Sequence, residues 1–124
     1  MHFEIHSSDP AKAIELYTAL FGWKITQWDK NDYWLIDTGE GEPGINGAIM
    51  PRMGEPPAAG GPVTAFVLTT EVEDLDEALN TATKHDAAIA LEPMAIPGVG
   101  RVAYLRDTDN NIFGVLQPEA PSPE

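Results

Sequence analysis

The chain has 124 residues, with 20 acidic and 7 basic side chains, no cysteine and a net charge of −13 at neutral pH. This length allows one compact domain and excludes an enzyme with separate cofactor and substrate domains. The absence of cysteine excludes disulfides, thiolate metal sites and thiol catalysis. The negative charge, which gives a pI of about 4.3, makes nucleic acid and anionic membrane surfaces unfavourable partners.

The first half of the chain predicts one helix among four strands. Residues 2–7 indicate a strand, and Asp9 and Pro10 begin an amphipathic helix that Gly22 ends. Apolar and β-branched residues predict further strands at 23–28, 33–38 and 45–50. No signal peptide and no apolar run of about 20 residues is visible, so we expect a cytoplasmic protein that does not span a membrane.

The second half predicts the same order of elements after a segment rich in proline and glycine. A strand is expected at 63–70, and Asp74 with Glu77 forms a capping-box pattern for a second helix, which ends near Lys84 and His85. Three more strands are expected at 87–91, 102–106 and 112–117. The residues after Pro118 are polar and rich in proline, which is typical of a frayed tail.

The two halves therefore predict a repeat. The segment WLIDT, which begins at Trp34, resembles YLRDT, which begins at Tyr104, and GAIMP at Gly47 resembles GVLQP at Gly114. The fold class expected is α+β, with two tandem βαβββ modules forming a cupped mixed β-sheet and helices outside. We expect a single domain with module one at about 1–51, a connector at 52–62, module two at 63–118 and a tail at 119–124.

Four segments give the chain a family resemblance: HFEIHSSDPAKAIELYTALFGW at the start, VEDLDEAL, IPGVGRVAYLRD and RDTDNNIFGVLQP near the end. They resemble the vicinal oxygen chelate superfamily, which includes glyoxalase I, extradiol dioxygenases and the fosfomycin- and bleomycin-resistance proteins. In the superfamily's usual Asp-Pro-x-Gly-Asn turn, Thr108 stands for Pro and Asn110 for Gly. Asn tolerates the left-handed conformation that Gly would supply, so we expect the turn to be kept.

The resemblance implies metal ligands on the first and last strand of each module. Counting back seven residues from Asp9 and from Asp74 places His2 and Val67 at the first-strand positions, and the last-strand positions fall on Gly47 and Gly114. Only His2 can bind a metal, whereas a catalytic site needs about three protein ligands. We therefore expect no metal ligand set and no cofactor, and a divalent metal is an unfavoured alternative.

The alternation of His2, Glu4 and His6 places three polar side chains on one face of the first strand, which the resemblance assigns to the cavity. One hypothesis makes these residues catalytic, with Glu4 as a base and a histidine as its partner. The other hypothesis is a polar strand that is partly solvated or packed at a subunit contact.

Four further residues are candidates for ligand binding. Trp34 and Tyr104 occupy matched positions and could line a cavity or belong to the core. Arg101 could orient a carboxylate or pair with an acidic side chain. Thr69 shares the face of Val67 and is a weaker candidate.

Two functions are favoured, and a regulatory domain with no ligand of its own is a third alternative. The first is a metal-independent small-molecule binder that resembles the bleomycin-resistance proteins, whose ligand the negative charge would favour as a cation. The second is a glyoxalase-type lyase or isomerase with a relocated site around His2, Glu4 and His6. The resemblance also implies a homodimer.

Overall fold

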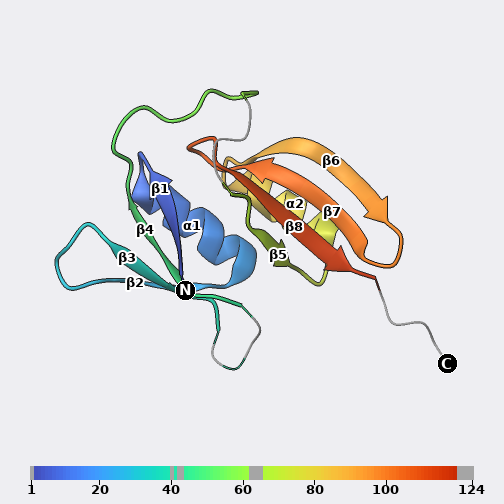
Figure 1. Ribbon diagram of the computed structural model, residues 1–124, viewed down its shortest axis with the longest axis horizontal. Coiled ribbons are helices and arrows are strands. Elements are labelled where there is room, and N and C mark those ends of the chain that lie inside the picture. The colour runs from blue at the N-terminus through green and yellow to red at the C-terminus, as the bar shows by residue number, and fades with distance from the viewer. Residues whose placement is uncertain (1, 40, 42–43, 62–65, 120–124) are drawn as a thin grey trace.

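The computed structural model describes residues 2–39, 41, 44–61 and 66–119, and it contains the expected repeat (Figure 1). The first module consists of β1 (Phe3–Ser7), α1 (Pro10–Phe21), β2 (Lys24–Gln27), β3 (Trp34–Asp37) and β4 (Gly47–Pro51). The second module consists of β5 (Thr69–Glu71), α2 (Leu75–Lys84), β6 (Ala88–Ile96), β7 (Gly100–Arg106) and β8 (Ile112–Pro118). Each module has the order βαβββ, so the α+β prediction is confirmed.

Each module forms its own four-stranded mixed sheet. The strand orders are β1-β4-β3-β2 and β5-β8-β7-β6. In both sheets the first strand pairs in parallel with the last, and the remaining pairs are antiparallel. Figure 1 shows β1 and β5 as the edge strands that face the middle of the molecule, with β2 and β6 at the outer edges.

The helix ends follow the capping pattern of the sequence. The Asp9 side chain accepts a hydrogen bond from the backbone N–H of Lys12, and Asp74 accepts one from Glu77. Gly22 ends α1 with a left-handed φ of 69° and donates its backbone N–H to Thr18, as a C-terminal glycine commonly does. Neither helix of the described chain is long and apolar enough to cross a membrane.

Both helices pack on the same side of the two sheets, and the core lies between these layers (Figure 1). Alternation along the strands gives each sheet one face toward the helices and one open face. The largest fully buried apolar side chains lie on the helices or on the helix-facing side of the strands: Leu16, Ile36, Ile49, Leu75, Leu105 and Val115.

Two strands differ from the expected bounds. Of the strand expected at 63–70, residues 63–65 lie outside the described residues and β5 begins only at Thr69, although the Leu68 carbonyl already accepts a hydrogen bond from Gly114. The strand expected at 87–91 continues to Ile96, through Pro93. Proline is tolerated there because β6 is an edge strand whose pairing with β7 is interrupted by register shifts.

The strand register corrects the alignment of the two modules by one residue. Glu4 pairs with Ala48 and Thr69 pairs with Gly114, and both pairs lie on the open faces. The counterpart of Gly114 is therefore Ala48 and not Gly47, whose side-chain position would point at the Phe3 ring. The similarities between WLIDT and YLRDT and between GAIMP and GVLQP match the right strands, but each alignment is shifted by one residue. A shift of one residue assigns every side chain of a strand to the opposite face of the sheet.

One turn of the second module joins the two halves. Within the described chain, every side-chain hydrogen bond between residues 2–61 and residues 66–119 ends on residues 107–111, which connect β7 to β8. In this turn Asn110 has the left-handed φ of 61° that the sequence predicts. The Asp107 side chain accepts hydrogen bonds from the backbone N–H groups of Asp109 and Asn111, which fixes the turn from inside.

Candidate functional site

A cavity of about 420 Å³ lies between the two modules. One wall comes from β1 and the other from residues 66–68, Thr70, the end of β7 and the start of β8, and the connector contributes Pro57, Ala58 and Gly61. The cavity is within the usual size range of small-molecule sites. The edges of the two sheets therefore enclose a space that neither module forms alone.

The floor of this cavity is aromatic. The ring of Trp23 lies 5.7 Å from Tyr17 in a stacked arrangement and 4.9 Å from Phe21. Phe113 of the second module meets Tyr17 edge-on at 5.3 Å. Burial together with the charge of Asp107 raises the pKa of Tyr17 well above its usual range, so its hydroxyl stays neutral.

The β1 wall carries a carboxylate among polar partners. Glu4 accepts a hydrogen bond from the Tyr33 hydroxyl at 3.1 Å and lies 3.5 Å from Nε2 of His6 and 3.9 Å from Nε2 of His2. The Tyr33 hydrogen bond and then the His6 contact hold the pKa of Glu4 below its ordinary value of 4.5. Glu4 is therefore ionised at neutral pH.

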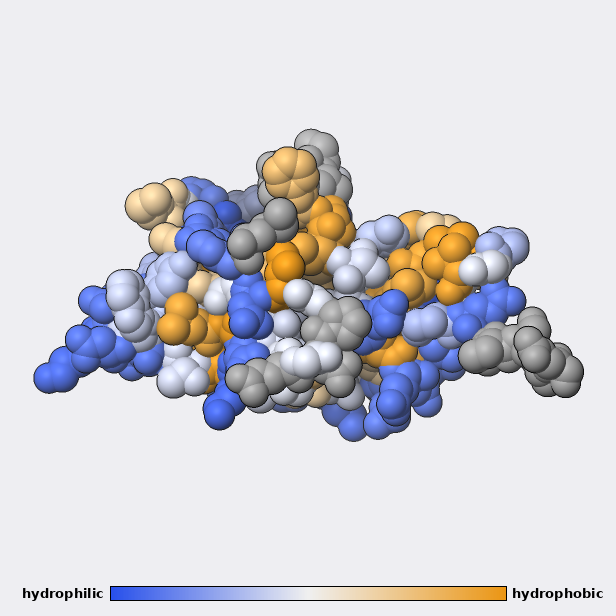
Figure 2. Space-filling model, turned by 60° about the horizontal axis from the view of Figure 1, so that its bottom comes forward, coloured by the Kyte–Doolittle hydropathy of each residue, from blue (hydrophilic) through white to orange (hydrophobic). Residues whose placement is uncertain are grey.

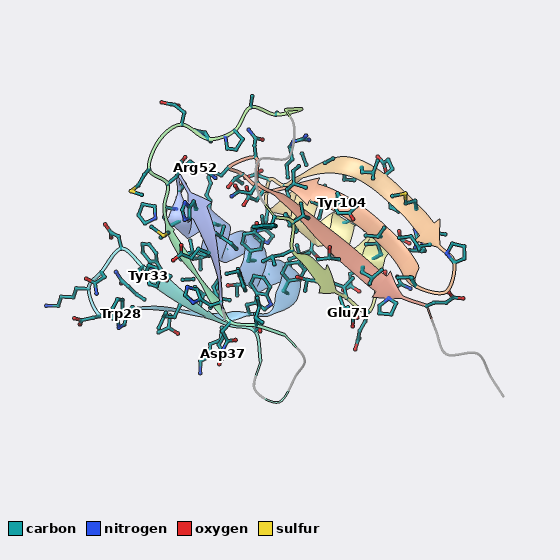
Figure 3. All side chains as sticks on the ribbon, viewed as in Figure 1. Trp28, Tyr33, Asp37, Arg52, Glu71 and Tyr104 are labelled. Carbon is teal, nitrogen blue, oxygen red and sulfur yellow. The ribbon has the colours of Figure 1, made fainter. Side chains whose placement is uncertain are left out.

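The backbone of His6 is fixed by two donors from elsewhere in the chain. Its carbonyl accepts hydrogen bonds from Nη2 of Arg52 at 2.9 Å and from Nδ2 of Asn111 at 3.0 Å. Figure 3 shows Arg52 where the connector leaves β4, beside the turn between β7 and β8. Arg52 also pairs with Asp109 and donates to Asn111, so one guanidinium links β1, the connector and the turn.

The three residues predicted as a catalytic group lie close together in the structure. His2, Glu4 and His6 all line the cavity. A second cavity of about 520 Å³ lies on the open face of the first sheet and also includes His2. The catalytic role itself stays a prediction.

The four residues predicted to bind ligand are not among the residues that line the 420 Å³ cavity. Trp34 packs against the core on the helix side of β3, and Arg101 lies 3.6 Å from Asp76 of α2. Thr69 and Tyr104 flank Gly114 on the open face of the second sheet, where Figure 3 shows Tyr104 on β7. The sequence allowed Arg101 either to orient a carboxylate ligand or to pair with an acidic side chain, and the structure shows the pairing with an acidic side chain.

The donor set does not fit the metal site that the resemblance implies. Among the described residues no group of three or more His, Asp or Glu side chains could hold a metal ion. Val67 lines the cavity without a ligand atom, and a side chain at Gly114 would meet Oγ1 of Thr69 at 2.5 Å. By strand register, the last-strand ligand position of the first module falls on Ala48 instead of Gly47, and alanine also has no atom that could bind a metal.

Sequence reasoning missed the floor and one charged residue of the cavity. Tyr17 and Phe21 belong to the amphipathic helix that the sequence predicts, and an amphipathic pattern does not distinguish a core residue from one that also borders a cavity. Arg106 lines the second wall. Its position on the strand face of Tyr104, two residues away, is the signal that could have identified it.

Comparisons with known proteins agree with this fold. The sequence model of the Glyoxalase/Bleomycin resistance protein/Dioxygenase superfamily matches residues 1–115. A protein named "Putative glyoxylase CFP32", from Mycobacterium tuberculosis and Mycobacterium bovis, is 30% identical over 118 residues. The match covers 93% of this chain but only 42% of that protein, so the chain spans less than half the length of these relatives.

Solved structures share the fold at low sequence identity. The fosfomycin resistance protein FosX from Mesorhizobium loti is 17% identical, with a TM-score of 0.69 over 96% of this chain and 91% of that chain. TioX from Micromonospora sp. ML1 is 23% identical, with a TM-score of 0.67 over 96% of this chain and 98% of that chain. Because the family match extends over nearly the whole sequence, the chain belongs to the glyoxalase/bleomycin resistance protein/dioxygenase superfamily.

Proposed function

We propose that the protein binds a small organic molecule in the cavity between its modules without the help of a metal ion. The observation that carries the proposal is the aromatic floor of Tyr17, Phe21, Trp23 and Phe113 beneath a 420 Å³ space. Aromatic faces bury a large apolar area and bind flat ligands well. The superfamily includes resistance proteins, and a binder of this kind fits that range.

A neutral fluorescent dye, N-phenyl-1-naphthylamine, tests this proposal because its binding needs no charge. Val67→Trp places a large side chain in the cavity, whereas Thr69→Trp changes a nearby residue that does not line it. We expect the dye to bind the unchanged protein and Thr69→Trp, and to be excluded by Val67→Trp. Equal binding to both variants would show that the dye binds elsewhere and would contradict the proposal.

A second candidate function is a glyoxalase-type lyase or isomerase. It is favoured by the contacts of Glu4, an ionised carboxylate that Tyr33 and His6 orient at the cavity wall. Such a carboxylate can act as a general base toward a proton next to a carbonyl group. The name of the mycobacterial relative supports the same chemistry.

The enzyme hypothesis is tested with the hemithioacetal of methylglyoxal and glutathione, whose isomerisation is followed by absorbance. Turnover that is lost in Glu4→Gln and kept in Glu71→Gln would support the enzyme. Glu71 is a suitable control because it is an exposed carboxylate of β5 that does not line the cavity. Absence of turnover in the unchanged protein would leave the binder as the proposed function.

We also propose a homodimer. Four large apolar side chains of the edge strand β6 are between 38% and 46% exposed: Ile89, Leu91, Met94 and Ile96. Figure 2 shows hydrophobic residues gathered over the second module, at the right of the view. Burial of such a strand against a second copy would remove this apolar surface from water.

A further inference from the structure

Arg106 differs from the other arginines of this chain because no described residue pairs with its charge. The chain has three arginines, and two of them pair with carboxylates: Arg52 with Asp109, and Arg101 with Asp76. Within the part of the chain that the structure describes, Arg106 has no ion pair and no side-chain hydrogen bond, although the protein carries 20 acidic residues. It lines the cavity instead.

The neighbouring Asp107 does not neutralise this guanidinium. Its carboxylate is buried, and it accepts four hydrogen bonds, from the Tyr17 hydroxyl, from the backbone of Asp109 and from the backbone and side chain of Asn111. A carboxylate whose oxygens are used in this way has little capacity left for another donor. The positive charge of Arg106 is therefore available to a molecule in the cavity.

The opposite charge lies on the other wall. Glu4 belongs to β1 of the first module and Arg106 to β7 of the second, and the aromatic floor lies in the same cavity. We infer that the cavity takes a small organic zwitterion, with a flat apolar body on the floor, an ammonium group at Glu4 and a carboxylate at Arg106. This inference rests on the proposed binding function and adds the chemical class of the ligand.

The chemistry of each wall suits its group. A guanidinium offers parallel N–H donors that match the two oxygens of a carboxylate. Glu4 keeps free acceptor capacity toward an ammonium group, since Tyr33 and His6 each occupy one side of its carboxylate. A ligand with only one charge would leave one wall without a partner, and a cation alone, which the net charge suggests, would not use Arg106.

Three probes with the same para-substituted benzene ring separate these contributions: 4-(aminomethyl)phenylacetate carries both charges, 4-methylphenylacetate only the carboxylate, and 4-methylbenzylamine only the ammonium group. Isothermal titration of the full chain with each probe measures affinity. We expect the zwitterion to bind most tightly. Arg106→Gln should weaken the two carboxylate probes about tenfold, as expected for loss of a charged hydrogen bond, and leave the amine unchanged.

Matched variants provide the controls. Arg101→Gln removes an arginine of the same strand that pairs with Asp76, and it should leave all three affinities unchanged. Glu4→Gln should weaken only the two amine probes, and Glu71→Gln none. Equal losses in Arg106→Gln and Arg101→Gln, or no preference for the zwitterion, would overturn the inference about ligand class. If the neutral dye is still excluded by Val67→Trp in that case, the binding function stands and only the ligand class fails.

Discussion

The hydroxyl of Tyr17 in α1 donates a hydrogen bond of 2.8 Å to Oδ2 of Asp107, which lies 90 positions further along the chain. Both residues are buried, with 2% and 3% of their surface exposed. The bond joins the helix of the first module to the turn between β7 and β8 of the second. The phenol ring also forms part of the cavity floor, so Tyr17 contributes both to the contact between the modules and to the candidate site.

Tyr17→Phe removes this bond and little else, because the ring and its stacking are kept. We expect a loss of about 1.5–3 kcal/mol in the free energy of unfolding, since a buried carboxylate loses one of its donors. Urea denaturation followed by circular dichroism measures the change. Tyr33→Phe is the matched control at a half-exposed tyrosine and should cost less than about 0.5 kcal/mol; equal losses would contradict this role of Tyr17.

The Arg52–Asp109 pair predicts a dependence of stability on pH. Burial raises the pKa of Asp109, but hydrogen bonds from Ser8 and Arg52 outweigh it and hold the pKa below its ordinary value of 3.8. Because the pKa of Asp109 is lower in the folded state, its ionised carboxylate stabilises the protein fully at pH values above the pKa of the unfolded state. This stabilisation is lost as the pH falls through the pKa of the folded state. Asp109→Asn should therefore cost about 3 kcal/mol at pH 7, as for a broken buried pair.

The difference in unfolding free energy between Asp109→Asn and the unchanged protein should shrink as the pH falls below 3.8. The pair of Arg101 and Asp76 provides the control, because its side chains are 43% and 74% exposed. Asp76→Asn should change stability by no more than about 1 kcal/mol at any pH. A constant cost of Asp109→Asn between pH 7 and pH 2.5 would show that the ion pair contributes nothing.

Divalent metals should not stabilise this protein. A specific site occupied at 100 times its dissociation constant would add about 2.7 kcal/mol to the unfolding free energy. Thermal unfolding in the presence of Zn²⁺, Mn²⁺ or Ni²⁺ should match unfolding in chelator, because Val67, Ala48 and Gly114 supply no ligand atoms. One metal ion per chain retained after dialysis, and lost in His2→Ala, would refute this expectation.

The homodimer is tested on β6. Replacing Leu91 and Met94 together by lysine places two charges on the exposed apolar strand, and we expect sedimentation velocity to show a change from twice the chain mass of 13.4 kDa to the chain mass itself. Met53→Lys changes a more exposed apolar residue of the connector, at 86% exposure, and should leave the dimer intact. A monomeric unchanged protein would contradict the proposal.

Much of the fold could be predicted because its signals are local. Asp9, Gly22 and Asp74 fix the helix ends by short-range hydrogen bonds and backbone conformation, and Asn110 adopts the conformation expected of the turn. The alignment of the modules failed by one residue because short similarities do not define strand register. Pairing of Glu4 with Ala48 depends on the whole sheet, and no single strand contains that information.

The site was less predictable than the fold. Alternation predicts that His2, Glu4 and His6 share one face of the first strand, and Nε2 of each histidine lies within 3.9 Å of the Glu4 carboxylate. Arg101 and Arg106 lie five positions apart on the same strand, so alternation alone places them on opposite faces. Which face meets Asp76 of α2 and which face borders the cavity depends on packing between distant segments. A contact between segments distant in sequence is not visible in composition or spacing.

Among the residues that the structure describes, every side-chain hydrogen bond between the two modules involves residues 107–111, and this separates two properties that ligand-binding proteins often couple. These polar links between the halves lie at one five-residue turn, whereas most of the residues that line the cavity belong to other segments, among them β1, α1 and the segment before β5. Substitutions in the lining can therefore change which molecule fits while the two halves keep their distance. A small displacement of the turn, in contrast, would widen or narrow the cavity for every ligand at once, so this turn is the position from which the whole binding spectrum of the scaffold can be adjusted.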